Sequence, residues 1–277
     1  MYLLKKIIPL VLLISIVVEA QELPPIVTYN VKDYSGENQN WEIDQSLDNY
    51  IYIGNNSGLL EFNGASWKKY PSTNNSIIRS VKVIDEKVFT GCYKDFGFWI
   101  KNNYGKLTYT SLTKKLPAEL LDDESFWNIL HYEDYVLFQS LKRIYIYNLS
   151  DESFKIIDAP SKRAAIFNLE NTIYFQKTNK GLFKIDNGEA ILVSNDNVLK
   201  NQVIVGAFSI NKKPLFLTEK GAFYFFENDV LSPWNISTSE ILKSKNIYSS
   251  IRLSDGSFIL GTISNGIYHI DKNGALI

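Results

Sequence analysis

The chain has 277 residues, 45% of them hydrophobic, and its aromatic side chains include 17 Tyr and 16 Phe. This composition is ample for a packed core and excludes an intrinsically disordered chain. The 29 Lys and Arg residues nearly balance the 30 Asp and Glu residues, and no basic run is longer than two. A surface that follows phosphates needs clustered positive charge, so we expect no direct nucleic-acid contact by these residues.

Residues 1–20 have the parts of a signal peptide. Lys5 and Lys6 form the positive end, residues 7–18 form an apolar stretch, and Ala20 is the small residue that precedes a cleavage site. The alternative is an uncleaved membrane anchor, but the apolar stretch is shorter than the about 20 residues that a spanning helix needs. We therefore expect a periplasmic protein that is exported and cleaved.

Residues 21–40 are expected to form a linker that contains one leading strand. Pro24 and Pro25 block regular structure at its start, whereas the apolar and aromatic side chains within residues 26–34 fit an isolated strand. In a ring of sheets, such a strand can complete the last unit and leave no exposed edge.

Residues 41–277 repeat one pattern six times. Each copy has an acidic or amide turn, a strand of aromatic and β-branched residues, a corner and a second strand, as in residues 255–271. The copies lie about forty residues apart, which is the length of one four-stranded propeller blade. Aligned on the residue that ends the strand after the turn, they fall at Gly54, Gly91, Gln139, Gln176, Thr218 and Gly261.

The repeat predicts an all-β fold, a β-propeller of about six four-stranded blades. In the first copy, strands are expected at residues 41–43, 50–54, 59–62 and 67–70. The turns of the later copies carry Asp, Glu or Asn, and such turns are typical of left-handed backbone. Helix is expected only as short turns between blades, within residues 117–123 and 237–243.

Two copies resemble the two-component-regulator propeller repeat, whose pattern is N-x-L-W-I-G-T-x-x-G-L-x-x-Y. The sixth copy, SFILGTISNGIYHID, and the first, YIYIGNNSGLLEF, match it well, whereas the third to fifth keep only its hydrophobic skeleton. GENQNWEI and VFTGCYKDFGFWIKN resemble one bacterial subgroup in particular. Its members are exported sensors with a propeller region, a triple-tyrosine domain, one membrane span and a cytoplasmic LuxR-type helix-turn-helix, or a histidine kinase instead.

The resemblance covers residues 26–277 and implies the N-terminal periplasmic sensor region of an inner-membrane regulator. It implies that any dimer contact, the membrane span and the output step belong to downstream domains that this sequence does not contain. Propellers of that family usually have seven blades, so we expect a gap of about one blade, poor solubility, and better behaviour when the chain is extended. In the alternative, residues 26–34 pair with the sixth copy and close a six-bladed ring.

The residues that carry enzyme chemistry do not form a recognisable site. His131 and His269 are the only histidines, they lie in different copies, and neither has ligand spacing around it. Cys92 is the only cysteine and is expected to be a structural residue at a blade corner. The acidic run 122–124 is interpreted as an exposed loop. No G-x-S-x-G elbow or nucleotide fingerprint is present, so we expect no catalytic residue, metal or cofactor.

Ligand binding is the remaining chemistry, and the starts of the inner strands are its first candidate location. These starts fall near residues 41, 79, 127, 164, 205 and 248. We expect Trp41, Arg79, Trp127 and Tyr248 to converge on one opening, where aromatic faces stack on sugar rings or apolar groups and Arg supplies planar donors. The ligand would be an oligo- or polysaccharide or another periplasmic compound. In the alternative, these aromatic residues fill the wedges between blades.

The second candidate location is the corner between the second and third strands of a blade. It contains Tyr93, Lys94 and Asp95 in the second copy, and Asn55 with Asn56 in the first. Two other functions stay open: an exported propeller enzyme that acts on polysaccharide, and a scaffold that binds protein partners. The enzyme would need two carboxylates about 5 to 10 Å apart in the channel.

We predict that the mature protein begins at Gln21. Export signals are removed after a small residue at this position, and Ala20 fits it. Intact-mass spectrometry of the periplasmic fraction should give the mass of residues 21–277. Membrane-bound protein that retains Met1 would refute cleavage.

Overall fold

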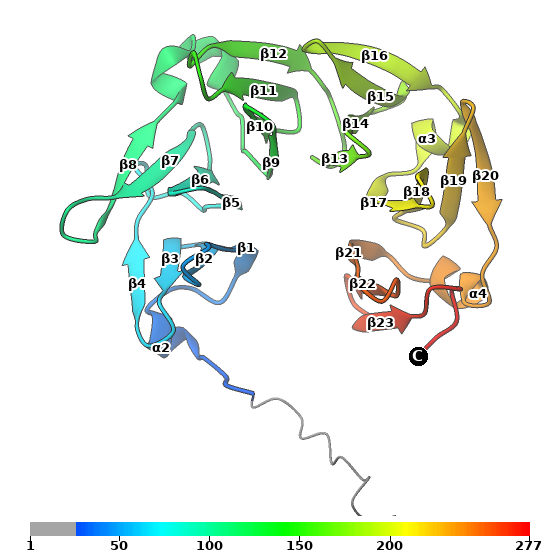
Figure 1. The fold of residues 1–277 in the computed structure, drawn as a ribbon, viewed down its shortest axis with the longest axis horizontal. Helices are drawn as coiled ribbons and strands as arrows, with labels where there is room; N and C mark the ends of the chain where they lie inside the picture. The colour runs from blue at the N-terminus through cyan, green and yellow to red at the C-terminus, as the bar shows by residue number, and fades with distance from the viewer. Residues whose placement is uncertain (1–25) are drawn as a thin grey trace, which may run out of the picture.

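The computed structural model describes residues 26–277, so the predicted signal peptide at residues 1–20 lies outside the described residues. Six antiparallel sheets surround a central opening as the blades of a propeller (Figure 1). Five blades have four strands and the sixth has three. The predicted all-β propeller of about six blades is therefore confirmed.

Within each blade the strands follow chain order, from the innermost to the outermost. Blades one to three contain β1 Asn40–Gln45, β2 Ile51–Asn55, β3 Gly58–Phe62, β4 Trp67–Tyr70, β5 Ser80–Ile84, β6 Lys87–Gly91, β7 Phe96–Lys101, β8 Leu107–Ser111, β9 Asn128–Tyr132, β10 Tyr135–Gln139, β11 Arg143–Asn148 and β12 Phe154–Asp158. Blades four to six contain β13 Ile166–Leu169, β14 Thr172–Lys177, β15 Gly181–Asp186, β16 Glu189–Ser194, β17 Ile204–Ile210, β18 Lys213–Thr218, β19 Phe223–Glu227, β20 Val230–Trp234, β21 Ile247–Arg252, β22 Phe258–Thr262 and β23 Ile267–Ile270.

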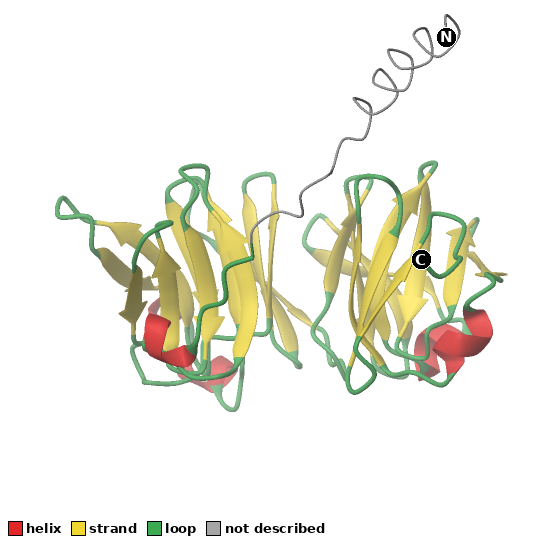
Figure 2. Cartoon of the chain, turned by 90° about the horizontal axis from the view of Figure 1, so that it is seen from below, coloured by secondary structure: helices red, strands yellow, loops and turns green. Residues whose placement is uncertain are grey.

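The helices are short and lie before β1 or between blades. Figure 2 shows them gathered on one side of the ring. They are α2 Val31–Tyr34, η1 Thr113–Lys115, η2 Ala118–Leu121, α3 Asn197–Asn201 and α4 Ser239–Lys243. The helical turns expected within 117–123 and 237–243 are thus present as η2 and α4. No helix among residues 26–277 is long and apolar enough to cross a membrane.

The hairpin turns on the opposite side have the left-handed backbone that their residues favour. Asp85, Glu133, Glu170 and Asn211 have φ values of 51°, 51°, 48° and 51°. Such turns match the right-handed twist of the flanking strands, which keeps the first two strands of each blade paired.

The core lies between the blades. Five hydrophobic clusters fill the interfaces between consecutive blades. Between blades two and three, for example, Phe89, Phe96, Phe138 and Tyr145 are fully buried, and Phe96 stacks on Phe138 with ring centroids 4.2 Å apart. Each blade therefore depends on its neighbour for the burial of one face.

In blades one, two and four, the residue used to align the copies lies against the next blade. A Cβ on Gly54 would stand 2.9 Å from the Ile78 carbonyl oxygen, and one on Gly91 would stand 2.6 Å from the Phe126 Cβ, so both glycines permit close approach. Gln176 replaces glycine in blade four and uses its side chain instead. Its Oε1 accepts a hydrogen bond from the Ile204 N–H of blade five at 3.1 Å.

The leading segment is not a strand, so that prediction is wrong. Residues 26–30 are irregular, and helix α2 follows, begun by a capping box between Asn30 and Asp33. The aromatic rings of Tyr29 and Tyr34 pack on the Trp67 ring, with centroids 5.4 and 5.7 Å away. These rings bury more surface on the aromatic face of blade one than a solvated strand would.

The ring is open between blades one and six (Figure 1). The leading segment packs on blade one, and the outer edge of β23 has only a single bridge, from Ile270 to Leu276. The alternative in which residues 26–34 close a six-bladed ring is therefore wrong. The uncovered face of blade six is apolar, because Ile251 and Ile267 are 57% and 73% exposed there.

We predict that this face drives self-association. Exposed apolar patches and open strand edges favour pairing with another chain. The double variant Ile251→Lys, Ile267→Lys should remain monomeric in sedimentation velocity at concentrations where the parent chain associates. The matched control is Ile156→Lys, Ile191→Lys on the outer strands β12 and β16. Equal association of all three proteins would contradict the prediction.

Candidate ligand-binding site

The inner strands begin on the helix-bearing side of the ring, and hydrogen bonds fix the residues just before them. The Arg79 N–H donates to the Gly91 carbonyl at 2.9 Å, and the Trp127 N–H donates to the Gln139 carbonyl at 2.9 Å. Both bonds continue the pairing of the first two strands of their blades by one residue. They hold Arg79 and Trp127 at equivalent places in blades two and three.

Three consecutive blades contribute to one stack. The Arg79 guanidinium lies over the rings of Trp41 and Trp127, with its Cζ 4.7 and 4.0 Å from the ring centroids. The two tryptophan rings meet edge to face with centroids 5.7 Å apart. The Trp41 Nε1–H donates to the Asn56 Oδ1 at 2.8 Å, which fixes the first ring. This stack holds a cation at the centre of two aromatic faces.

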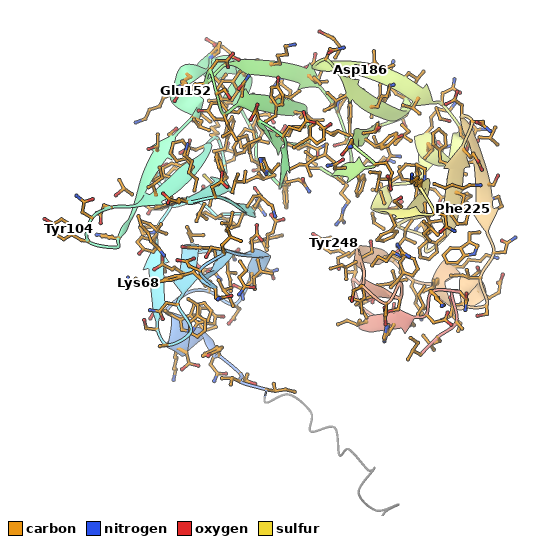
Figure 3. All side chains as sticks on the ribbon, viewed as in Figure 1. Lys68, Tyr104, Glu152, Asp186, Phe225 and Tyr248 are labelled. Atoms are coloured by element: carbon orange, nitrogen blue, oxygen red, sulfur yellow. The ribbon has the colours of Figure 1, made fainter. Side chains whose placement is uncertain are left out.

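A second cation–aromatic pair comes from blades four and six. The Cζ of Arg163 lies 4.4 Å from the centroid of the Tyr248 ring. Tyr248 is 48% exposed, and Figure 3 shows it at the inner end of blade six, beside the central opening. Arg163 was not predicted from the sequence. The only signal was its position next to Ala164, the expected start of the fourth inner strand.

A cavity of about 480 Å³ joins these two groups. This volume is within the range of small-molecule sites. Its lining residues are Trp127, Leu141, Lys162, Arg163, Ala164, Val203, Val205, Glu219, Asn246, Ile247, Tyr248 and Ile263. The cavity and the Trp41–Arg79–Trp127 stack beside it are called the mouth below. Trp41, Arg79 and Trp127 lie together in the stack, and Trp127 and Tyr248 line the same cavity, whereas their role as one ligand site stays a prediction.

The mouth is positively charged. Partial burial lowers the pKa of Arg79 and of Arg163, yet both remain cations because the pKa of a guanidinium lies far above neutral pH. Among residues 26–277 neither guanidinium has a hydrogen-bond acceptor or an acidic side chain within ion-pair distance. Lys162 adds a third cation, and Glu219 is the only acid in the described lining.

The wedge-filling role belongs to other aromatic residues. Phe89, Phe96 and Phe138 are fully buried between blades, whereas Trp41 and Trp127 are half-buried at the opening. The mouth aromatics therefore have surface that a ligand can reach.

The second predicted location is not assembled as a site. Asn55 is buried, and its amide binds the backbone of Glu37 through bonds of 3.0 and 2.8 Å. Asp95 is also buried and accepts hydrogen bonds of 2.7 Å from Thr73, Ser111 and Thr113. Both residues hold loops, so the prediction that they face a ligand is wrong. A local repeat cannot distinguish a buried polar anchor from an exposed one.

Tyr93 and Lys94 of the same corner are exposed, and neither lines the cavity of the mouth. The Lys94 ammonium forms an ion pair of 2.8 Å with Asp122. The acidic run was predicted to be an exposed loop, which is wrong for Glu124. Glu124 is buried and pairs with Arg143 at 2.6 Å.

The remaining candidates have structural positions. Burial raises the pKa of the Cys92 thiol to about 11, so little of it is thiolate near neutral pH. His131 and His269 lie on strands β9 and β23, as expected. Within the described part of the chain, no group of His, Cys, Asp or Glu side chains is arranged to hold a metal.

Two carboxylates of β1 accept hydrogen bonds from backbone N–H groups at the inner edge of blade two. The Val81 N–H donates to the Glu42 Oε2 at 2.9 Å, and the Val83 N–H donates to the Asp44 Oδ2 at 2.8 Å. Lys82 pairs with Asp44 at 2.9 Å, whereas no cation pairs with Glu42 among the described residues. Burial raises the pKa of Glu42 from 4.5 to about 7.

Comparison with solved structures finds this fold in extracellular domains of bacterial regulators. The extracellular domain of the candidate one-component system BT4673 from B. thetaiotaomicron has a TM-score of 0.64 and 18% identity, over 86% of this chain and 33% of that chain. The extracellular domain of the candidate hybrid two-component system BT3049 from the same organism has a TM-score of 0.60 and 14% identity, over 91% and 36%. BamB from Moraxella catarrhalis has a TM-score of 0.56 and 12% identity, over 84% and 70%.

These identities show a shared propeller fold. The chain spans about a third of the length of the two regulator domains. No protein-family model and no curated protein matches the sequence. The predicted likeness to regulator propellers is thus confirmed at the level of the fold.

We predict that Glu42 makes the stability of the protein fall as the pH rises. Its pKa is higher in the folded chain, so the folded state holds more protons between pH 4.5 and about 7. The stability from this group is fully present below the unfolded pKa and is lost as the pH rises through the folded pKa. Glu42→Gln keeps the acceptor oxygen and stays neutral.

Urea unfolding at pH 5 and pH 8 should therefore give a smaller pH effect for Glu42→Gln than for the parent chain. The difference should be roughly 1–3 kcal/mol. Glu86→Gln in the exposed β5–β6 turn is the control and should keep the parent slope. The same slope in all three proteins would contradict the assignment.

Proposed function

We propose that this chain is the extracytoplasmic ligand-sensing propeller of a membrane-spanning bacterial regulator. The observation that carries the proposal is the mouth. Cationic and aromatic side chains of five different blades meet at one opening, although local packing of each blade does not require it. A set of exposed aromatic faces with unpaired donors is a binding arrangement.

The fold of the neighbours supports an extracytoplasmic setting. The BT4673 and BT3049 structures are extracellular domains of candidate one-component and hybrid two-component systems. The resemblance of the first and sixth copies to the two-component-regulator repeat is consistent with this. The output, either a kinase or a LuxR-type DNA-binding domain, would lie in a different part of the regulator.

The region is proposed to bind its ligand without changing it. Hydrolysis of a polysaccharide by the usual mechanism needs two placed carboxylates. The described cavity lining has only Glu219, with Arg163 and Lys162 as its charged neighbours. The proposed ligand is an oligo- or polysaccharide, because aromatic faces beside polar donors suit sugar rings.

We predict that Trp127→Ala weakens ligand binding roughly 5- to 150-fold. Loss of this ring removes one wall of the cavity and one side of the Arg79 stack. Losses of about 1–3 kcal/mol are usual for such contacts. Isothermal titration calorimetry with a panel of defined oligosaccharides measures the effect, and circular dichroism checks that the variant is folded.

Tyr135→Ala is the matched control. Tyr135 lines a cavity of about 450 Å³ on the turn side of the ring, away from the mouth. Its loss should leave binding unchanged. Mass spectrometry should recover every bound oligosaccharide intact. Loss of binding in Tyr135→Ala alone would move the site to the other side, and released products would favour the polysaccharide enzyme.

A further inference from the structure

We propose that the mouth recognises an acidic oligosaccharide, with a carboxylate or sulfate group held by Arg163 and Arg79. This inference rests on the proposed function and specifies its ligand class. A carboxylate and a sulfate share one chemical feature: each presents a compact array of negatively charged oxygens. Guanidinium donors bind such arrays in pairs of parallel hydrogen bonds.

The first support is that both guanidiniums are held by stacking and not by acids. Arg79 lies in the corner formed by two indole rings that meet edge to face, and Arg163 lies over the ring of Tyr248. Contact with aromatic rings does not use the N–H donors of a guanidinium in conventional hydrogen bonds. No acceptor oxygen of residues 26–277 lies within hydrogen-bond distance of either edge. Arg143, by contrast, bonds to Glu124 at 2.6 Å and to the Leu120 carbonyl at 3.2 Å.

The second support is partial burial of both arginines without a hydrogen bond or ion pair. Burial lowers the pKa of both arginines because removal from water disfavours a cation, and for Arg163 the negative charge of Glu219 offsets part of this effect. A bound anion would restore the lost interaction with water. Arg163 lines the cavity, and Arg79 contacts Trp127, which lines the same cavity, so both cations belong to the mouth.

The third support is the shape and charge of the cavity. Its volume of about 480 Å³ exceeds that of a lone inorganic anion and suits a short oligosaccharide. Lys162 and Arg163 bring two positive charges to the cavity lining against the single negative charge of Glu219. Arg79 in the neighbouring stack adds a third positive charge to the mouth. The exposed face of Tyr248 provides a surface for a sugar ring beside the anionic group.

The experiment compares matched acidic and neutral sugars on the full chain by titration calorimetry. The probes are galacturonic acid oligomers against galactose oligomers of equal length, and a sulfated disaccharide against its unsulfated form. We expect at least one acidic member to bind at least tenfold more tightly than its neutral partner. The pair of sugars that shows this preference identifies whether the bound group is a carboxylate or a sulfate. The affinity for the acidic sugar should fall with added salt.

Arg163→Ala should then weaken the acidic ligand roughly 10- to 100-fold and bring it to the level of the neutral sugar. Arg163→Lys keeps the charge but loses the paired donors, so an intermediate affinity is expected. Lys106→Ala removes an exposed cation of the β7–β8 hairpin and should change nothing. Thermal unfolding of each variant checks its fold.

Three outcomes would overturn the inference in different ways. Equal affinity for acidic and neutral sugars, with loss of both in Trp127→Ala, would reject the acidic ligand and leave the mouth as a binding site. No binding by any member of the panel would reject the acidic ligand and the proposed sugar-sensing function together. Acidic binding that survives Arg163→Ala and Arg79→Ala would also reject the proposed contacts.

Discussion

The structure depends on one constraint: each blade buries its apolar side chains against the adjacent blade. A four-stranded sheet has two faces, and only the next blade can cover the side chains of one of them. The aligned position of the repeat lies at this contact, with Gly54 and Gly91 allowing close approach and Gln176 reaching across. The same constraint explains the ends of the ring. Tyr29 and Tyr34 cover blade one, whereas Ile251 and Ile267 stay exposed on blade six.

The central opening imposes a second requirement, because the inner edge of each blade has unpaired backbone groups. Side chains of the adjacent blade meet part of this need. Glu42 and Asp44 accept from β5, and the Ser80 hydroxyl donates to the Phe126 carbonyl at 3.1 Å. These side chains make the inner edges of blades one and two polar. At the helix-bearing end of the channel, the residues at or before the starts of the inner strands are the larger Trp41, Arg79, Trp127 and Arg163. Their side chains form the mouth.

Repetition made the fold predictable from the sequence. The turns and the strand after each turn follow from equivalent positions in successive copies, and so does the contact of Trp41, Arg79 and Trp127 in one stack. Features that lack a repeat were harder to predict. The leading segment contains alternating apolar residues that fit a strand, but its rings bury better on Trp67. Arg163 was missed because no other copy has a cation at its position.

The most direct test of this account is fluorine NMR of the protein labelled with 5-fluorotryptophan. The chain has five tryptophans, and each gives its own resonance: Trp41, Trp67, Trp99, Trp127 and Trp234. The resonances are assigned by single substitution and followed during titration with the tightest acidic oligosaccharide. The account predicts that the signals of Trp41 and Trp127 shift while the other three stay in place. Shifts confined to Trp67, Trp99 or Trp234 would contradict it, because these rings lie away from the mouth.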